Sequence, residues 1–168
     1  MKQLYLIRHA KSSWSHPELT DFERPLNKRG RRDAPVMGSL LKEKGIKFSS
    51  FISSPATRAI MTAKLIADAV GYAVDDIITD IQIYDAPTNK LLSIVQSFPD
   101  QFETIALFGH NPAMTELPEL LTGKSLENVP TCGVVGIRFP ALTWQTVKEK
   151  SGELFLFEYP KKYLKSDD

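Results

Sequence analysis

Two stretches of the chain are largely apolar without alternation and predict buried strands. They are residues 3–8, QLYLIR, and residues 104–109, TIALFG. A strand has this pattern when helices cover both faces of its sheet, because its side chains are then buried on either side. Weaker apolar runs predict further strands at 48–53, 77–83, 134–139 and 153–159.

Segments with apolar residues at helical spacing lie between these strands. They predict helices at about 27–44, 54–70, 88–98 and 111–121. Asn27 is a candidate cap for the first helix and Gly45 is its expected end, while Gly71 should end the second. Pro35 lies within the first predicted helix and should kink it, and Pro118 should interrupt or bend the last.

Strands and helices alternate along the chain until two strands follow one another at the end. This order predicts an α/β fold, a three-layer α/β/α sandwich around a mixed, mostly parallel sheet. An antiparallel pairing of the last two strands would make the sheet mixed. We expect residues 1–160 to form one domain and residues 161–168, KKYLKSDD, to form a polar C-terminal tail.

Composition and charge narrow the function without naming it. Of 168 residues, 42% are apolar and 24% charged, and the formal net charge is +1, as in an ordinary globular protein without a nucleic-acid or membrane partner. The basic run at 28–32, KRGRR, is interpreted as a solvated helical turn, because no aromatic residues are interleaved with it. With no signal-peptide pattern and no long apolar stretch, a cytoplasmic location is the expectation. The single cysteine, Cys132, excludes an internal disulfide and a cysteine-based zinc cluster.

Basic and imidazole side chains stand where the predicted strands end. Arg8 ends the first buried strand and His9 follows it, His110 follows the second, and Arg58 lies early in a helix that follows another strand. Ligands of such sheets bind at the carboxyl ends of the strands, so these side chains would meet if the strands are neighbours. Two arginines can hold phosphoryl oxygens through paired hydrogen bonds. One imidazole can attack phosphorus while the other donates a hydrogen bond, and the nearby helix N-termini add free N–H groups.

Several motifs, in this order, resemble those of the histidine phosphatase superfamily. LIRHA resembles its RHG signature, SSPATRAIMTA its second arginine motif and GHNP its second histidine motif. RHAKSSW followed by ERPLNKRG is most similar to the small, SixA-like branch of phosphohistidine phosphatases. The resemblance covers residues 3–115 and implies a phosphoglycerate mutase-like fold. Ala10 departs from the glycine of the RHG signature, a change that the small branch often tolerates.

The resemblance implies a role for each matched residue. His9 would be the nucleophile that is phosphorylated during turnover, and Arg8, Arg58 and His110 would form the phosphate pocket. Arg24, in ERPL, resembles a further phosphate-binding residue of the small branch. No metal or other cofactor is expected, because the arginines supply the positive charge that Mg²⁺ supplies in other phosphoryl-transfer enzymes.

The proton donor is the part of the site that the motifs leave open. No segment clearly matches the proton-donating glutamate of the larger family members. Asp85, in IYDAP, lies at about the right place in chain order and is a candidate, and the alternative is a turn carboxylate ahead of Pro87. His16 is interpreted as a loop residue, and no two histidines have the spacing of a helical metal site.

The sequence therefore predicts a phosphatase that forms a phosphohistidine on His9, with phosphohistidine on a protein as the favoured substrate. Two alternatives stay open: a phosphatase of small phosphorylated metabolites such as sugar phosphates, and a non-catalytic phosphate- or phosphoprotein-binding module. An intact His9 favours catalysis over the module. The predicted elements use most of the chain between Arg58 and His110, which leaves little for a lid, so we expect an open pocket with few contacts.

Overall fold

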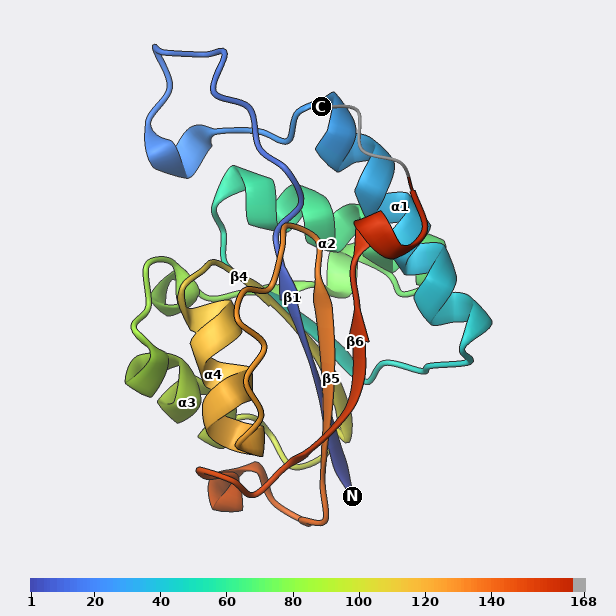
Figure 1. Ribbon diagram of the computed structural model, residues 1–168, viewed down its shortest axis with the longest axis vertical. Helices are drawn as coiled ribbons and strands as arrows, with labels where there is room; N and C mark the ends of the chain where they lie inside the picture. The colour runs from blue at the N-terminus through green and yellow to red at the C-terminus, as the bar shows by residue number, and fades with distance from the viewer. Residues whose placement is uncertain (165–168) are drawn as a thin grey trace.

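The structure is a computed structural model that describes residues 1–164 (Figure 1). Within that range, six strands form one sheet in the order β3-β2-β4-β1-β5-β6. The strands are β1 (Lys2–Arg8), β2 (Ser50–Ser53), β3 (Ile78–Thr79), β4 (Thr104–Gly109), β5 (Val134–Phe139) and β6 (Glu153–Glu158). The α-helices are α1 (Lys28–Glu43), α2 (Thr57–Val70), α3 (Thr88–Gln96) and α4 (Ala113–Thr122).

The sheet is mixed and mostly parallel, as the order of elements predicts. β1, β2, β3 and β4 pair in parallel, and β5 runs antiparallel to both of its neighbours, β1 and β6. The last two strands are therefore neighbours in an antiparallel pair. The carboxyl ends of β1, β2 and β4 meet at one edge of the sheet, which is the upper edge in Figure 1.

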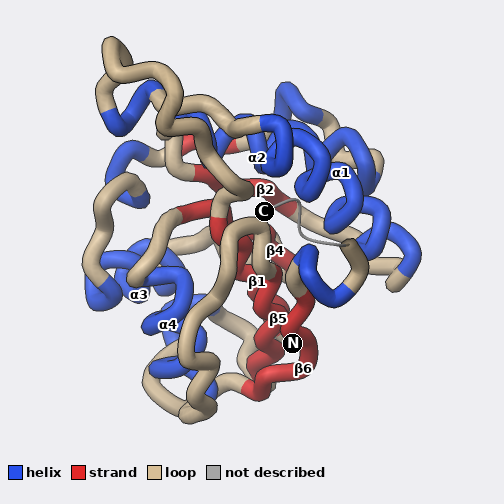
Figure 2. The backbone as a smooth tube through the Cα atoms, turned by 45° about the horizontal axis from the view of Figure 1, so that its top comes forward, coloured by secondary structure: helices blue, strands red, loops and turns tan. Residues whose placement is uncertain are grey.

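Alternate residues of the central strands face two separate layers of helices. Leu4 and Leu6 belong to the core that includes α3 and α4, whereas Tyr5 and Ile7 belong to the core that includes α1 and α2. Each of these side chains is at most 1% exposed, so β1 is buried on both faces. Figures 1 and 2 show the two pairs of helices on opposite sides of the sheet. The predicted three-layer sandwich is confirmed.

The first helix begins and ends where its capping residues predict. The side-chain oxygen of Asn27 accepts a hydrogen bond from the N–H of Gly30 at 2.9 Å, which satisfies one of the free donors of the first turn. Gly45 follows the helix with a φ of +75°, a conformation that glycine adopts without strain. The helix continues through Pro35.

The predicted strand at 77–83 is wrong over most of its length. Only Ile78–Thr79 is extended, and Ile81–Ile83 forms a 3₁₀ turn. Asp80 starts that turn, because its carboxylate accepts a hydrogen bond from the N–H of Gln82 at 2.9 Å. Ile78 and Ile81 are 45% and 62% exposed, so the apolar run does not mark a buried strand.

Two predicted helix boundaries also differ from the structure. The helix expected from Ser54 begins at Thr57, because the N–H of Ser54 donates to the carbonyl of Phe108 and so still belongs to the sheet. The helix expected at 111–121 is α4, which begins at Ala113 and continues through Pro118 without interruption.

Part of the predicted polar tail is ordered against the domain. Pro160–Lys162 forms a 3₁₀ turn that lies next to α1, and residues 165–168 lie outside the described part of the chain. Among residues 1–164, we find no helix with the length and hydrophobicity needed to cross a membrane.

Gly30 lets the first turn of α1 approach the strand end that carries His9. A Cβ atom at this position would lie 2.2 Å from the carbonyl oxygen of Lys11. We expect Gly30→Ala to lower the free energy of unfolding by about 1–3 kcal/mol, because the helix must move away from this backbone. Urea unfolding measures this change. Ser39→Ala, at an exposed position of the same helix, is the control and should cause no loss. Equal stability of the two variants would show that the helix yields without cost.

Candidate active site

The parallel pairing of β1 with β4 brings the LIRHA and GHNP motifs together. Arg8 is in register with Gly109, so His9 and His110 follow the two strand ends side by side. The centroids of their rings lie 5.3 Å apart. The charges of Arg8 and Arg58 both act on each imidazole. The structure thus brings together the four side chains that the sequence selects.

His9 has a defined tautomer. Its Nδ1 atom lies 2.8 Å from the carbonyl oxygen of Ala10, and since a carbonyl only accepts, Nδ1 must carry the hydrogen. The lone pair is therefore on Nε2. Burial first, and then the neighbouring His110, Arg58 and Arg8, lower the pKa of His9 to about 3. At neutral pH the imidazole is uncharged and can act as a nucleophile through Nε2.

Backbone contacts fix the strand end that carries His9. The N–H of Ala10 donates to Oγ1 of Thr62 at 2.9 Å, and that hydroxyl donates to the carbonyl of Arg58 at 2.7 Å. The N–H of Cys132 lies 3.0 Å from the carbonyl oxygens of both Arg8 and His9. The strand end that carries His9 is therefore tied to α2 on one side and to the segment ahead of β5 on the other.

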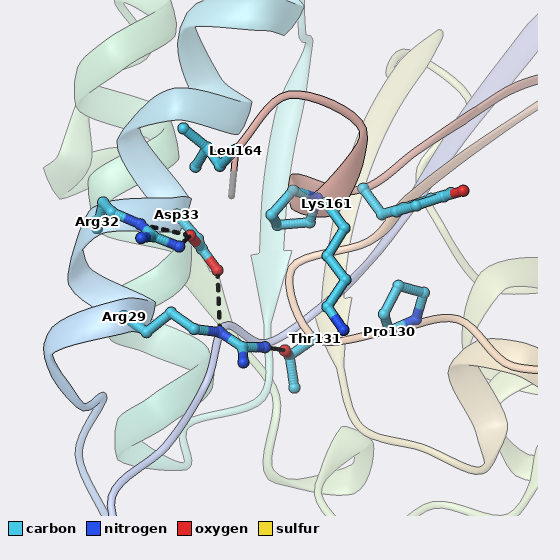
Figure 3. A pocket seen from close by; sticks show the side chains of 9 residues that line it. Arg29, Arg32, Asp33, Pro130, Thr131, Lys161 and Leu164 are labelled. Carbon is cyan, nitrogen blue, oxygen red and sulfur yellow. Dashed lines mark hydrogen bonds and ion pairs between the residues drawn. The ribbon is translucent and has the colours of Figure 1, made fainter. Parts of the chain in front are cut away.

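The first turns of α1 contact the segment ahead of β5 through Arg29 and Thr131, as Figure 3 shows. Arg29 donates from Nη2 to Oγ1 of Thr131 at 3.3 Å, and its Nε lies 3.5 Å from Oδ2 of Asp33. Asp33 is only 1% exposed and also accepts from Arg32. These contacts hold Thr131 in place next to Cys132, whose N–H contacts the carbonyl oxygens of Arg8 and His9.

His110 is oriented by a serine that the sequence analysis missed. Its Nε2 lies 2.9 Å from Oγ of Ser54, which also accepts a hydrogen bond from the N–H of Ala56. The Ser54 hydroxyl can then donate to Nε2, which leaves the hydrogen of His110 on Nδ1. Burial, then the charge of Arg58, lowers the pKa of His110 to about 4, so the ring is a neutral donor. The position of Ser54, directly after a buried strand, was the signal that could have found it.

Both arginines are anchored through their outer nitrogens. Nη1 of Arg8 donates to the carbonyl of Val129 at 3.0 Å. Nη1 and Nη2 of Arg58 donate to the backbone oxygen and to Oδ2 of Asp21, at 2.7 and 3.0 Å. The Nε atoms of Arg8 and Arg58, together with Nδ1 of His110, are buried and have no hydrogen-bond partner among residues 1–164. Buried donors without acceptors are costly, and an anion with several oxygens would satisfy all three.

Asp21 is a second site residue that the sequence analysis missed. Its carboxylate accepts from the hydroxyl of Tyr84 at 2.7 Å and from Arg58, and it forms an ion pair with Arg24 at 3.2 Å. The hydrogen bond from Tyr84 is the largest cause that lowers the pKa of Asp21 to about 2, followed by Arg58. Asp21 therefore stays ionised and holds Arg58 in place. Its place three residues before the arginine of ERPL was the available signal.

Arg24 contacts the other site residues through its hydrogen bonds to Asp21. Its Nε and Nη2 donate to Asp21, and its Nη1 donates to Oγ of Ser12 at 2.8 Å. Its guanidinium carbon lies 3.6 Å from the ring centroid of Trp14. Every guanidinium nitrogen thus has a protein partner. Direct contact of Arg24 with phosphate stays a prediction.

A cavity of about 310 Å³ opens beside Arg58 and His110. The segments on either side of it supply its walls: Asp21, Arg58, Ile83, Tyr84, Asp85, Ala86, Pro87, Leu91, His110, Asn111, Pro112, Ala113 and Met114. Residues 81–87 supply one wall of the pocket, because they leave the sheet as a turn and loop. Asp85 lies on this wall, where its role as proton donor stays a prediction. Within residues 1–164, no cluster of three or more histidine, cysteine or acidic side chains could hold a metal ion.

Comparisons with known proteins agree with this geometry. The model of the histidine phosphatase superfamily (branch 1) matches residues 4–131. An uncharacterized chloroplastic protein of Arabidopsis thaliana is 31% identical over 160 residues, which cover 90% of this chain and 72% of that protein. An Agrobacterium tumefaciens protein assigned as the phosphohistidine phosphatase SixA is 27% identical, with a TM-score of 0.80 over 95% of this chain and 98% of that one. The protein histidine phosphatase SixA in complex with tungstate has the same TM-score and coverage at 16% identity, which shows the fold alone.

The two imidazoles make folding stability depend on pH. Their pKa values are lowered to about 3 for His9 and about 4 for His110, whereas an unfolded chain protonates histidine near pH ~6.5. As the pH falls below ~6.5, the unfolded chain therefore binds protons that the folded protein does not. We expect the free energy of unfolding to fall as the pH drops from about 6.5 towards 4, by up to about 1.4 kcal/mol per pH unit for each histidine.

Urea unfolding across this pH range measures the effect. Carboxyl groups also titrate here, so the double variant His9→Gln, His110→Gln is the control. It should lose less stability on acidification than the natural protein. The same slope in both proteins would show that the two rings are not held neutral by burial.

Proposed function

Since the chain belongs to the histidine phosphatase superfamily, we propose that it is a metal-independent phosphatase that forms a covalent phosphohistidine on His9. The observation that carries this proposal is the set of three unpartnered buried nitrogens beside a neutral imidazole: Arg8 Nε, Arg58 Nε and His110 Nδ1. The donors would bind phosphoryl oxygens, and the lone pair on His9 Nε2 would bind phosphorus.

In the first step, the His9 Nε2 lone pair attacks phosphorus opposite the leaving group. The P–N bond forms as the bond to the leaving group breaks, and the leaving group departs with that electron pair. Negative charge is spread over the three equatorial oxygens of the transition state. Arg8, Arg58 and His110 stabilise this charge, because their donors are already fixed in place by the protein.

In the second step, water attacks phosphorus from the side that the leaving group vacated. The new P–O bond forms as the P–N bond breaks, and the electron pair returns to Nε2. Both protons of the water leave with the phosphate, which departs as dihydrogen phosphate and then ionises in solvent. The hydrogen bond from Nδ1 to the carbonyl of Ala10 supports the ring throughout, since His9 starts and ends as the same neutral tautomer.

The leaving group decides how much acid help the first step needs. An alkoxide needs a strong proton donor, and Asp85 on the cavity wall is the candidate for that role. The imidazole of a phosphohistidine can leave neutral if its other ring nitrogen already carries a proton. We therefore propose phosphohistidine on a protein as the substrate. We also propose that this phosphatase acts in the cytoplasm.

Two other functions remain candidates. The walled cavity of about 310 Å³ favours a small phosphorylated metabolite more than an open pocket would. A non-catalytic phosphate-binding module is less well supported, because binding alone does not require the buried, neutral His9 with its lone pair on Nε2.

Substitution of the two histidines separates their roles. We expect His9→Ala to abolish turnover of p-nitrophenyl phosphate and any acid-labile, base-stable phosphoenzyme. His110→Ala should slow turnover by about 10²–10³ and still allow some phosphoenzyme to be trapped, because it removes a stabilising donor and keeps the nucleophile. Equal residual activity in the two variants would contradict these roles. EDTA should leave the rate unchanged, and inhibition that added metal reverses would require a metal mechanism.

The preferred substrate is measured by comparing kcat/KM values. We expect a phosphotransfer protein phosphorylated on histidine to exceed several sugar phosphates, because its imidazole leaves without strong acid help. A sugar phosphate preferred by about tenfold or more would instead support the small-metabolite alternative. His9→Ala is the control for phosphohistidine lost by spontaneous hydrolysis.

A further inference from the structure

The cavity beside Arg58 and His110 is placed to receive the leaving group. Arg58 and His110 line it, but neither Arg8 nor His9 does, so it extends away from the nucleophile. An in-line displacement puts the leaving group on the side of phosphorus opposite the attacking atom. The inference that follows rests on the proposed function, because only a phosphatase has a leaving group to place.

Apart from Arg58, the charged side chains in the described cavity lining are two carboxylates, Asp21 and Asp85. Among residues 1–164, Arg58 is the only arginine or lysine that lines it, and Arg58 is paired with Asp21. His110 is neutral, because burial holds its pKa near 4. Asp85 is exposed and forms no hydrogen bond or ion pair within the part of the chain that the structure describes. Its carboxylate is thus the one uncompensated charge on the wall.

The remaining wall is apolar and aromatic. Ile83 and Met114 are buried. The Tyr84 and His110 rings pack edge to face, with their centroids 5.5 Å apart. Phe22 packs against Tyr84 at 5.0 Å and holds that ring in place. Such a wall suits a flat or alkyl leaving group.

A neighbouring depression carries the same charge. It shares Asn111 and Pro112 with the cavity, and its described lining includes Glu116, Glu119 and Glu127 but no lysine, arginine or histidine. Substrate atoms that extend past the cavity would therefore meet further carboxylates. Both hollows favour the same kind of substrate.

We propose that this site selects phosphorylated substrates by the charge of the leaving group, with Asp85 as the specificity-determining residue. Neutral and cationic leaving groups, such as an imidazole or an alkylammonium alcohol, are accepted. Leaving groups with a carboxylate or a second phosphate are rejected, because Asp85 repels them and no free cation receives them. Asp85 is exposed, so we expect discrimination of about tenfold rather than a complete block.

Three phosphomonoesters that differ in leaving-group charge test this selection. They are phosphocholine, glycerol 1-phosphate and 3-phosphoglycerate, whose leaving groups are cationic, neutral and anionic. Kd is measured by calorimetry on His9→Ala, which keeps the cavity but not the nucleophile, and kcat/KM on the natural protein. We expect phosphocholine to bind about tenfold more tightly than 3-phosphoglycerate, with glycerol 1-phosphate between them. Equal affinities or the reverse order would overturn the proposal.

Variants at Asp85 assign the effect to this carboxylate. Asp85→Asn in the His9→Ala background should remove most of the difference in Kd, and Asp85→Lys should reverse its order. Asp75→Asn, at an exposed position outside the cavity, is the matched control and should leave the order unchanged. If Asp85→Asn in the otherwise natural protein lowers kcat for all three esters equally, and leaves the Kd ratio intact in the His9→Ala background, Asp85 is a proton donor and not a specificity residue.

The two proposals fail in different ways. A natural protein that does not hydrolyse p-nitrophenyl phosphate would refute the proposed function, while the order of Kd values could still hold. A natural protein that hydrolyses it without discriminating among the three esters would refute only the selection by charge.

Discussion

Buried N–H groups without acceptors are the constraint around which this site is organised. Arg8 and Arg58 use their outer nitrogens to bind protein oxygens, and each keeps a buried Nε that has no partner in the described part of the chain. His110 has the same division, with Ser54 on one ring nitrogen and no partner on the other. In the function proposed here, a phosphoryl group would supply the missing acceptors and complete the hydrogen bonds of these donors.

Burial and positive charge together set the protonation state of His9. Burial and the nearby arginines keep His9 neutral, and the carbonyl of Ala10 fixes its hydrogen on Nδ1. Asp21 lies among Arg58, Arg24 and Tyr84, where it binds both guanidinium groups and offsets their charge. The loop that carries Asp21 therefore belongs to the site as much as the strand ends do.

The parts of the fold that the sequence predicts well are those set by burial. The strands at 104–109 and 134–139 match the structure at both ends, because their apolar runs coincide with two-sided burial. The run at 77–83 fails, because Ile78 and Ile81 lie near the sheet edge, where solvent reaches them. At the site, motif positions locate the imidazoles and the arginines. The bonds from Ser54 and Asp21 join segments far apart in sequence, and no local pattern encodes such partners.

The most direct measurement of this account is a crystal structure of the protein with vanadate, which adopts the geometry of phosphoryl transfer. We expect vanadium bonded to Nε2 of His9 and its equatorial oxygens within hydrogen-bond distance of Arg8 Nε, Arg58 Nε and His110 Nδ1. The group opposite His9 should point into the cavity that Tyr84 and Asp85 line. Vanadate bound elsewhere, or a His9 ring turned to present Nδ1, would contradict the central claim.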